Sequence, residues 1–147
     1  MQIQFSKYCL SLILLSYLQL SQSTILEEAV IEYIQSLVQI CGNESGLSEQ
    51  DIHLIASDQV DDLYRAPISD NFKCFLHCFY LKLNLFDENG QPIVSEYFKE
   101  YIGDHFSVSE DKAAAAMEKC AAIRDENKCE NVIKVELCIM DVVNYKY

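Results

Sequence analysis

The sequence predicts an all-α fold in which six short helices surround an internal apolar cavity and three disulfides staple the helices together. Apolar residues recur three and four positions apart in several segments, and Ser and Asp stand where helix N-caps are expected. No segment shows the sustained apolar–polar alternation of a half-buried strand, and no linker rich in Pro, Gly or Ser divides the chain. The 147 residues therefore suit one helical domain.

The first 23 residues have the layout of a secretory signal peptide. Lys7 precedes an apolar run at positions 8–20, and Ser21-Gln22-Ser23 supplies the small residues that signal peptidase requires. A membrane anchor is the weaker alternative, because the run is shorter than the ~20 apolar residues of a spanning helix. We therefore expect cleavage before Thr24, a secreted, extracellular domain of residues 24–147, and no stable membrane insertion.

The first three helices of the mature domain follow from apolar spacing and capping residues. The first covers residues 25–41, and we expect Gly42 to end it. The second begins after Ser48, because Asp51 three residues later completes a capping pattern. The third is strongly apolar, starts at a cap on Ser69 or Asp70 and reaches about residue 86, before a turn at 87–92.

Three further helices complete the predicted fold. Residues 93–102 form the fourth, which Gly103 ends. Ser107 and Glu110 make a capping pattern for the fifth, which contains four consecutive Ala residues and runs to about Ile123. The sixth is marked by an apolar stripe of Val132, Val135, Ile139 and Val142.

The net charge limits the possible partners. Asp and Glu outnumber Lys and Arg by 23 to 11, which gives a formal charge of -12. Such a chain cannot neutralise the phosphates of a nucleic acid, so we expect no nucleic-acid partner, and anionic membrane surfaces are disfavoured for the same reason. Half of the residues are hydrophobic, which is enough to bury a core.

The cysteines indicate a disulfide framework. Seven are present, and Cys9 would leave with the signal peptide, so an even number remains for an oxidising compartment. Cys74 and Cys78 are four apart on one helix and cannot pair without strain, and Cys129 and Cys138 would lie about 13 Å apart on the last helix. Ten of the fifteen possible pairings remain. A framework of this kind can hold helices apart around a cavity that an unstapled core would fill.

The cysteine spacing also carries a resemblance. Thirty-two, three, forty-one, eight and eight residues separate Cys41, Cys74, Cys78, Cys120, Cys129 and Cys138 in turn. This spacing, the leader and the six helices resemble those of the insect odorant-binding proteins of the pheromone-binding and general odorant-binding type. The resemblance covers the whole mature chain. It includes the segment Lys73-Cys74-Phe75-Leu76-His77-Cys78, then Lys82, and the turn Phe86-Asp87-Glu88-Asn89-Gly90.

The resemblance implies one disulfide pairing, and the chain departs from the family pattern at one position and in two lengths. The implied pairs are Cys41 with Cys78, Cys74 with Cys129, and Cys120 with Cys138. Asn84 stands where many members have Gly, and Asn tolerates the left-handed backbone that such a turn needs. The gap between the first two cysteines is longer than in many members, and only nine residues follow the last cysteine, so the long C-terminal tail of some pheromone carriers is missing.

The function implied by the resemblance is that of a secreted carrier, not an enzyme. It would bind a small hydrophobic ligand such as an odorant or pheromone in the internal cavity and transport it through aqueous fluid to an olfactory receptor, as a monomer or weak homodimer and with no cofactor. The alternative is a non-olfactory carrier of small lipophilic molecules in saliva, haemolymph or reproductive fluid. A secreted hydrolase is less favoured, because no Ser, His and acid set has supporting context.

The candidate pocket residues are apolar or aromatic, and for each of them ordinary core packing is the competing interpretation. They are Phe72, Phe75, Leu76, Phe79, Val94, Tyr97, Phe98, Ala114, Met117, Val132, Val135, Ile139 and Tyr145. The sequence Asn43-Glu44-Ser45 is an N-glycosylation sequon.

The three histidines have two competing interpretations. His77 between two cysteines suggests a metal, but zinc would need thiolates that an oxidising compartment converts to disulfides, so we expect no metal site. His53, His77 and His105 titrate nearest physiological pH, which motivates the hypothesis that acidification speeds ligand release. The competing interpretation is that all three are simply solvated.

Overall fold

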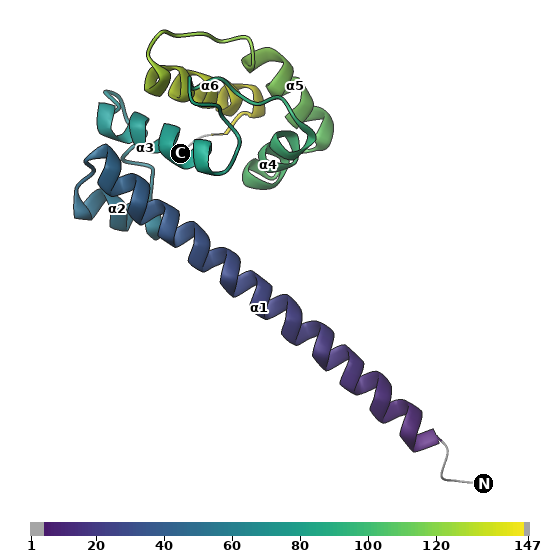
Figure 1. The fold of residues 1–147 in the computed structure, drawn as a ribbon. Helices are drawn as coiled ribbons and strands as arrows, with labels where there is room; N and C mark the ends of the chain where they lie inside the picture. Colours follow the sequence, from purple (N-terminus) through teal and green to yellow (C-terminus); the bar gives the residue numbers. More distant parts are fainter. Residues whose placement is uncertain (1–4, 146–147) are drawn as a thin grey trace. The chain divides into compact units, whose positions relative to one another are not determined.

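The structure is a computed structural model that describes the backbone of residues 5–145 and the side chains of residues 24–145. Six helices occur in this part of the chain: α1 (Phe5–Ser45), α2 (Glu49–Ala56), α3 (Asp70–Lys82), α4 (Glu96–Phe106), α5 (Glu110–Cys120) and α6 (Lys128–Val143) (Figure 1). Apart from one isolated bridge between Phe86 and Pro92, no strand pairing occurs among the described residues. The all-α prediction is confirmed.

The chain divides into two units, residues 1–36 and residues 37–147. The described backbone of the first unit is a single helical segment, the beginning of α1. The predicted signal peptide, residues 1–23, lies outside the residues whose side chains are described, so its cleavage stays a prediction. No helix in the described part of the chain has both the length and the apolarity needed to span a membrane.

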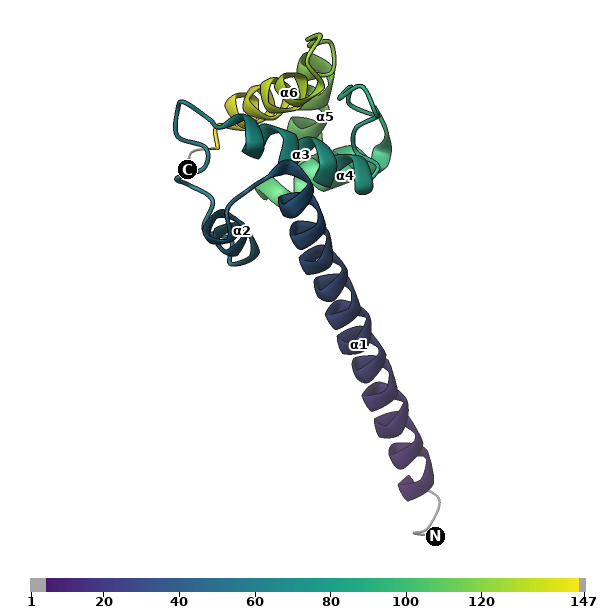
Figure 2. The ribbon, with the colours of Figure 1, turned by 60° about the vertical axis from the view of Figure 1, so that its left-hand side comes forward.

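The second unit contains the end of α1 and the other helices. Within it α6 packs against α3 and α5, and α4 packs against α5 (Figure 2). The predicted end of the first helix at Gly42 is wrong, because α1 continues to Ser45. Gly42 serves a different purpose: a Cβ there would lie 2.5 Å from Cγ1 of Ile52, so the missing side chain lets α1 and α2 approach closely.

Two predicted caps are confirmed and one is wrong. The hydroxyls of Ser48 and Ser69 accept the backbone N–H groups of Asp51 and Phe72 and so begin α2 and α3. Ser107 does not cap the fifth helix. It ends α4 in a left-handed conformation with φ of 52°, and Ser109 caps α5 instead.

The other boundary errors come from the turn at 87–92 and from early helix ends. α3 ends at Lys82, because Asn84 adopts a left-handed conformation and the Leu85 N–H bonds back to Tyr80 O. α4 begins at Glu96, because residue 93 is held in an extended segment by a hydrogen bond from its N–H to Leu85 O. That helix also passes through Gly103, and α5 ends at Cys120 rather than at about Ile123.

Three disulfides join Cys41 to Cys78, Cys74 to Cys129, and Cys120 to Cys138, with Cα–Cα distances of 5.6, 4.7 and 5.8 Å. This is the pairing that the resemblance implies. α3 is bonded through its two cysteines to α1 and to α6. The four helices that carry cysteines are thus connected in the order α1, α3, α6, α5.

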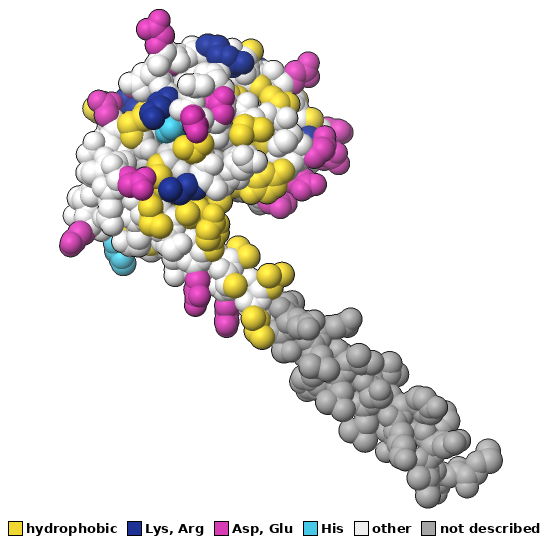
Figure 3. All heavy atoms as spheres, in the orientation of Figure 1, with side chains coloured by type: hydrophobic (Ala, Val, Ile, Leu, Met, Phe, Trp, Pro, Cys, Tyr) yellow, Lys and Arg dark blue, Asp and Glu magenta, His cyan; other side chains and the backbone are white. Residues whose placement is uncertain are grey.

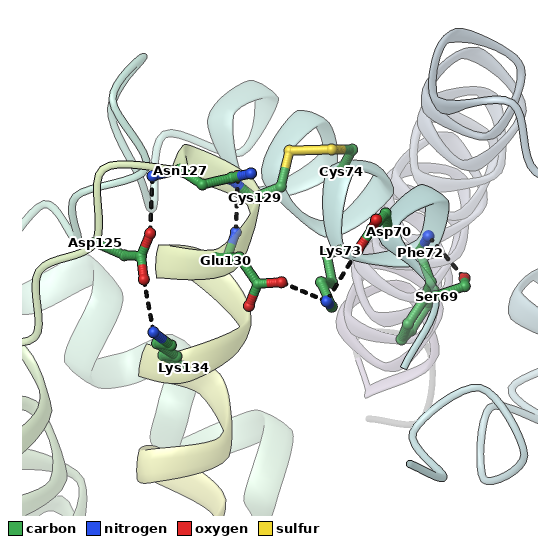
Figure 4. Close-up of polar contacts among 10 residues, drawn as sticks. All are labelled: Ser69, Asp70, Phe72, Lys73, Cys74, Asp125, Asn127, Cys129, Glu130 and Lys134. Atoms are coloured by element: carbon green, nitrogen blue, oxygen red, sulfur yellow. Dashed lines mark hydrogen bonds and ion pairs between the residues drawn. A yellow bond between two sulfur atoms is a disulfide. The ribbon is translucent and has the colours of Figure 1, made fainter. Parts of the chain in front are cut away.

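Polar contacts surround the disulfide between α3 and α6 (Figure 4). The Lys73 ammonium donates to Asp70, 3.0 Å away on its own helix, and to Glu130 on α6. Asn127 caps α6 by accepting the N–H groups of Cys129 and Glu130 at 2.9 and 3.2 Å. Each of these polar groups has a partner, so this end of the helix pair is fixed by both covalent and polar contacts.

Candidate functional site

The core of the second unit brings most of the candidate pocket residues together. Buried members of one apolar cluster are Phe72, Phe75, Leu76, Phe98, Met117, Val132, Val135 and Ile139, and Phe79 packs against that cluster. They come from four helices, α3, α4, α5 and α6. The helices position them because each has an apolar face at three- and four-residue spacing. Their role as ligand contacts stays a prediction.

Four candidates lie outside this buried set. Val94 and Tyr97 are 68% and 51% exposed, because the segment before Glu96 is extended and α4 turns Phe98, Ile102 and Phe106 to the core instead. Ala114 is half-buried on α5. Tyr145 is 40% exposed, but its ring lies 5.1 Å from that of Phe106, measured between ring centroids.

Aromatic rings form a continuous series of contacts through the unit. Neighbouring ring centroids along this series lie between 4.7 and 6.4 Å apart, distances at which aromatic rings attract one another. The members are Tyr64, Phe72, Phe75, Phe79, Tyr80, Phe86, Phe98, Tyr101, His105, Phe106 and Tyr145. These rings make the interior of the unit apolar and aromatic.

One buried carboxyl group interrupts this apolar interior. Glu136 on α6 is 4% exposed, and its Oε1 accepts hydrogen bonds from the hydroxyls of Tyr64 at 2.5 Å and Tyr80 at 2.8 Å. Its other oxygen, Oε2, is buried and has no hydrogen-bond partner among the described residues. The sequence analysis missed Glu136, although its position four residues after Val132 and three before Ile139 places it on the apolar stripe.

Burial changes the acidity of this cluster. It raises the pKa of Glu136 to about 7 from an ordinary value of 4.5, and the hydrogen bonds from Tyr64 and Tyr80 oppose that rise. Burial, and to a smaller extent the neighbouring Glu136, raises the pKa of Tyr80 well above its ordinary value. This phenol therefore stays protonated and remains a hydrogen-bond donor. Near neutral pH the Glu136 carboxyl therefore exists in both its neutral and its charged form.

A second set of buried polar groups holds the turn at 87–92 against α6. The Asn131 amide donates to Gly90 O at 2.6 Å, and Gly90 has φ of 72°. A Cβ on Gly90 would lie 2.4 Å from the carbonyl oxygen of Lys128, so no larger residue fits there. His77 is 5% exposed, and its Nε2 lies 3.3 Å from Asp87 O. These groups position the turn.

The histidines differ from one another in environment. His53 is exposed, as a solvated histidine would be. His77 is 5% exposed, and burial lowers its pKa. His105 is exposed like His53, but it stacks on the Tyr101 ring at 5.3 Å. The interpretation that all three are solvated is therefore wrong. No cluster of three His, Cys, Asp or Glu side chains in the described residues could hold a metal ion.

The surface offers a different environment from the core. Acidic side chains are scattered over the face seen in Figure 3, with hydrophobic side chains between them. Two open depressions lie along α4, one lined by Tyr97, Glu100, Tyr101, Asp104 and His105 and the other richer in acidic residues. Neither encloses an apolar molecule.

Asn43 of the sequon is exposed, as glycosylation requires, and its modification stays a prediction.

Comparisons with known proteins agree on one family. The model of the PBP/GOBP family matches residues 24–142. The chain is similar to general odorant-binding protein 56a of Drosophila melanogaster, with 35% identity over 72 residues, which are 48% of each chain. The match thus spans about half the length of that relative.

A solved structure is similar in fold. It is the fatty acid binding protein OBP56a from the oral disk of the blowfly Phormia regina, with a TM-score of 0.59 and 22% sequence identity. The similarity covers 77% of this chain and 90% of the blowfly protein. At that identity the likeness supports the helical fold alone.

Proposed function

Because the chain belongs to the PBP/GOBP family, we propose that it is an extracellular carrier that encloses one small hydrophobic molecule within its second unit and transports it through aqueous fluid. The observation that carries the proposal is the family match over residues 24–142, which includes every cysteine of the disulfide framework. The proposed site is the aromatic interior between α3, α4, α5 and α6. Binding needs no chemical step, since burial of apolar surface at about 25 cal/mol per Å² drives it.

The lining supports a ligand that is apolar and variable in shape. Phe72, Phe75 and Phe79 form a row of rings along α3, with centroids 6.0 and 5.7 Å apart. Met117 on α5 is flexible and adapts to different outlines. The exposed acidic side chains keep such a carrier soluble and limit its association with other proteins.

The relatives point to two settings for this carrier. One is named as an odorant-binding protein and the other as a fatty acid binding protein of the oral disk. We propose odorant or pheromone transport to an olfactory receptor as the first candidate, and a non-olfactory carrier of lipophilic molecules as the second. Localisation of the transcript to antennae or to another secretory tissue separates the two.

Displacement of a fluorescent apolar probe tests the proposal. The protein is secreted from insect cells with its disulfides formed, and its N-terminus is read by mass spectrometry to test cleavage before Thr24. We expect the probe to bind and a panel of volatiles and fatty acids to displace it with dissociation constants in the micromolar range, about -8 kcal/mol. If the oxidised protein binds no probe, the carrier function is wrong.

A further inference from the structure

We propose that Glu136 is the polar anchor of the pocket and that the ligand it selects carries a hydroxyl group, so that the preferred ligand is an apolar alcohol. The inference rests on the proposed carrier function and adds the chemical class of its ligand. It stands on three observations: a carboxyl group almost fully removed from solvent, one oxygen with two phenol donors, and a second oxygen with none.

The geometry leaves one atom of Glu136 available to a ligand. Oε1 already accepts from Tyr64 and Tyr80, which come from the loop before α3 and from α3 itself. Oε2 is also buried and has no donor among the described residues. A buried carboxylate oxygen without a donor costs free energy, and a ligand that supplies the donor recovers it. The cluster is thus built to orient a polar group inside an otherwise apolar interior.

Among the residues that the structure describes, no opposite charge pairs with this carboxyl group. α3 presents Tyr80 to it and the loop before α3 presents Tyr64, while Tyr101 of α4 lies against Tyr80 with His105 stacked behind it. α5 turns Ala113, Ala116, Met117 and Cys120 inward, and none of these titrates in the folded protein. Of the lysines on α3 and α6, Lys73 pairs with Asp70 and Glu130, and Lys134 pairs with Asp125. Lys82 and Lys128 are exposed, away from the buried carboxyl group.

A hydroxyl group is the headgroup that suits both forms of the carboxyl. It donates to Oε2 when Glu136 is charged, and it accepts from the carboxyl O–H when Glu136 is neutral. An ether or ester oxygen can only accept, so it pairs only with the neutral form. An alkylammonium brings three donors to a single available oxygen, and a carboxylate brings a second negative charge. An ammonium or a carboxylate headgroup would therefore be buried with unsatisfied hydrogen-bonding groups or with a repelling charge, so the alcohol should bind more tightly than either.

The test compares an alcohol with its own methyl ether, for example a long-chain alkanol and the matching alkyl methyl ether, in the wild-type protein and in Glu136→Gln. At pH 8.5 Glu136 is charged, and we expect the wild type to bind the alcohol about tenfold more tightly than the ether, as a hydrogen bond to a charged group provides. At pH 5.5 the carboxyl is neutral, and the preference should fall below about threefold, because both ligands then accept the same proton.

In Glu136→Gln the two tyrosines keep the amide oxygen as their acceptor, so the NH₂ group takes the place of Oε2. That group donates equally to an alcohol and to an ether, so we expect no more than about a twofold preference at either pH. Glu118→Gln, an exposed position on α5, removes the same charge outside the core and should behave as the wild type does.

A second measurement needs no variant. The carboxyl carbon of Glu136 is followed by NMR as pH is varied, with alcohol or ether bound to the wild-type protein. The ether pairs only with the neutral carboxyl and should raise the apparent pKa of Glu136. The alcohol pairs with both forms, so the apparent pKa of Glu136 should be lower with the alcohol bound than with the ether bound. This result stands even if Glu136→Gln does not fold.

The outcomes separate the anchor from the carrier function. If the wild type binds the probe but shows the same alcohol preference as Glu136→Gln, Oε2 is not the ligand's partner, and the anchor is wrong while the carrier stands. If the ether and the alcohol shift the NMR titration equally, the anchor is also wrong. If neither the alcohol, the ether nor the probe binds, the carrier function itself fails.

Discussion

The two ends of the α3–α6 pair differ in the contacts that hold the helices together. At the Lys73 end, a disulfide and an ion pair join the two helices and Asn127 caps α6, while the nearby buried Oδ1 of Asn131 on α6 has no hydrogen-bond partner among the described residues. One to two turns further along, at Tyr80 and Glu136, the polar groups are buried and one carboxyl oxygen has no donor. We call the Lys73 end, where covalent and ionic contacts join the helices, the fixed end, and the Tyr80–Glu136 end, where a buried titratable group lacks a donor among the described residues, the unsatisfied end. An unsatisfied buried group costs free energy, and contacts elsewhere in the fold, such as those of the fixed end, offset that cost.

The largest change should come from removal of the disulfide at the fixed end. The Cys74→Ser/Cys129→Ser variant opens a loop of 55 residues, which by chain entropy lowers the free energy of unfolding by about 4 kcal/mol. The Cys120→Ser/Cys138→Ser variant opens a loop of only 18 residues and should lose about 3 kcal/mol. Urea denaturation of both variants measures the losses, and a stability equal to the wild type would show that the fixed end needs no covalent bond.

The next largest effect is the pH dependence at the unsatisfied end. The pKa of Glu136 is raised by burial from 4.5 to about 7, so the neutral form is favoured in the folded chain. The stability this provides is fully present below pH 4.5 and is lost as pH rises to about 7. Relative to Glu136→Gln, the wild type should therefore lose about 3 kcal/mol between pH 4.5 and pH 8. Denaturation of both proteins across this range measures it; a constant difference would contradict the buried titration.

A smaller effect is expected from removal of one phenol donor. Tyr80→Phe deletes a hydrogen bond that favours the charged carboxylate, so the pKa of Glu136 should move further up from about 7. The loss of a hydrogen bond to a buried group costs about 1 to 2 kcal/mol at pH 8 and less at pH 5, where the carboxyl is neutral. NMR titration of the Glu136 carboxyl carbon checks the direction. Tyr97→Phe, at an exposed position on α4, is the matched control.

The smallest effect should come from the ion pairs at the fixed end. Lys73→Met removes the contacts to Asp70 and Glu130, and the side chains of those two partners are 90% and 33% exposed. Salt screens such contacts, so the variant and the wild type should differ slightly at low ionic strength and become equal in 1 M salt. Thermal denaturation at two salt concentrations measures this. A difference that salt does not change would mean that Lys73 stabilises the pair by packing of its aliphatic stem.

The sequence predicted the helices better than their ends. Periodic apolar residues indicate a helix because they need a buried face, but the ends depend on contacts that no local pattern contains. α1 does not end at Gly42, because Gly42 packs against Ile52 within the helix. α4 begins later than predicted, because the segment before it is hydrogen-bonded to residue 85. Glu110 three residues after Ser107 favours Ser107 as the cap of the fifth helix, but the left-handed end of α4 occupies Ser107 and leaves Ser109 to cap α5.

The candidate site was predictable in its apolar part only. Residues on the inner faces of α3, α5 and α6 are found by spacing. Val94 lies in the segment before α4, and Tyr97 lies on the side of α4 opposite to its buried residues, so both are exposed. Glu136 was missed because an acidic residue counts as polar wherever it stands. Its two phenol partners are 72 and 56 residues away, so their convergence appears only in the folded chain.

The order in which the disulfides are linked has a consequence for survival in a fluid that contains proteases. The three bonds overlap along the chain: Cys41–Cys78 encloses Cys74, and Cys74–Cys129 encloses Cys120, whose own bond reaches Cys138. Every peptide bond between Cys41 and Cys138 therefore lies inside at least one covalent loop. One cut anywhere in that span, in a surface turn or within a helix, would leave both fragments joined as a single molecule.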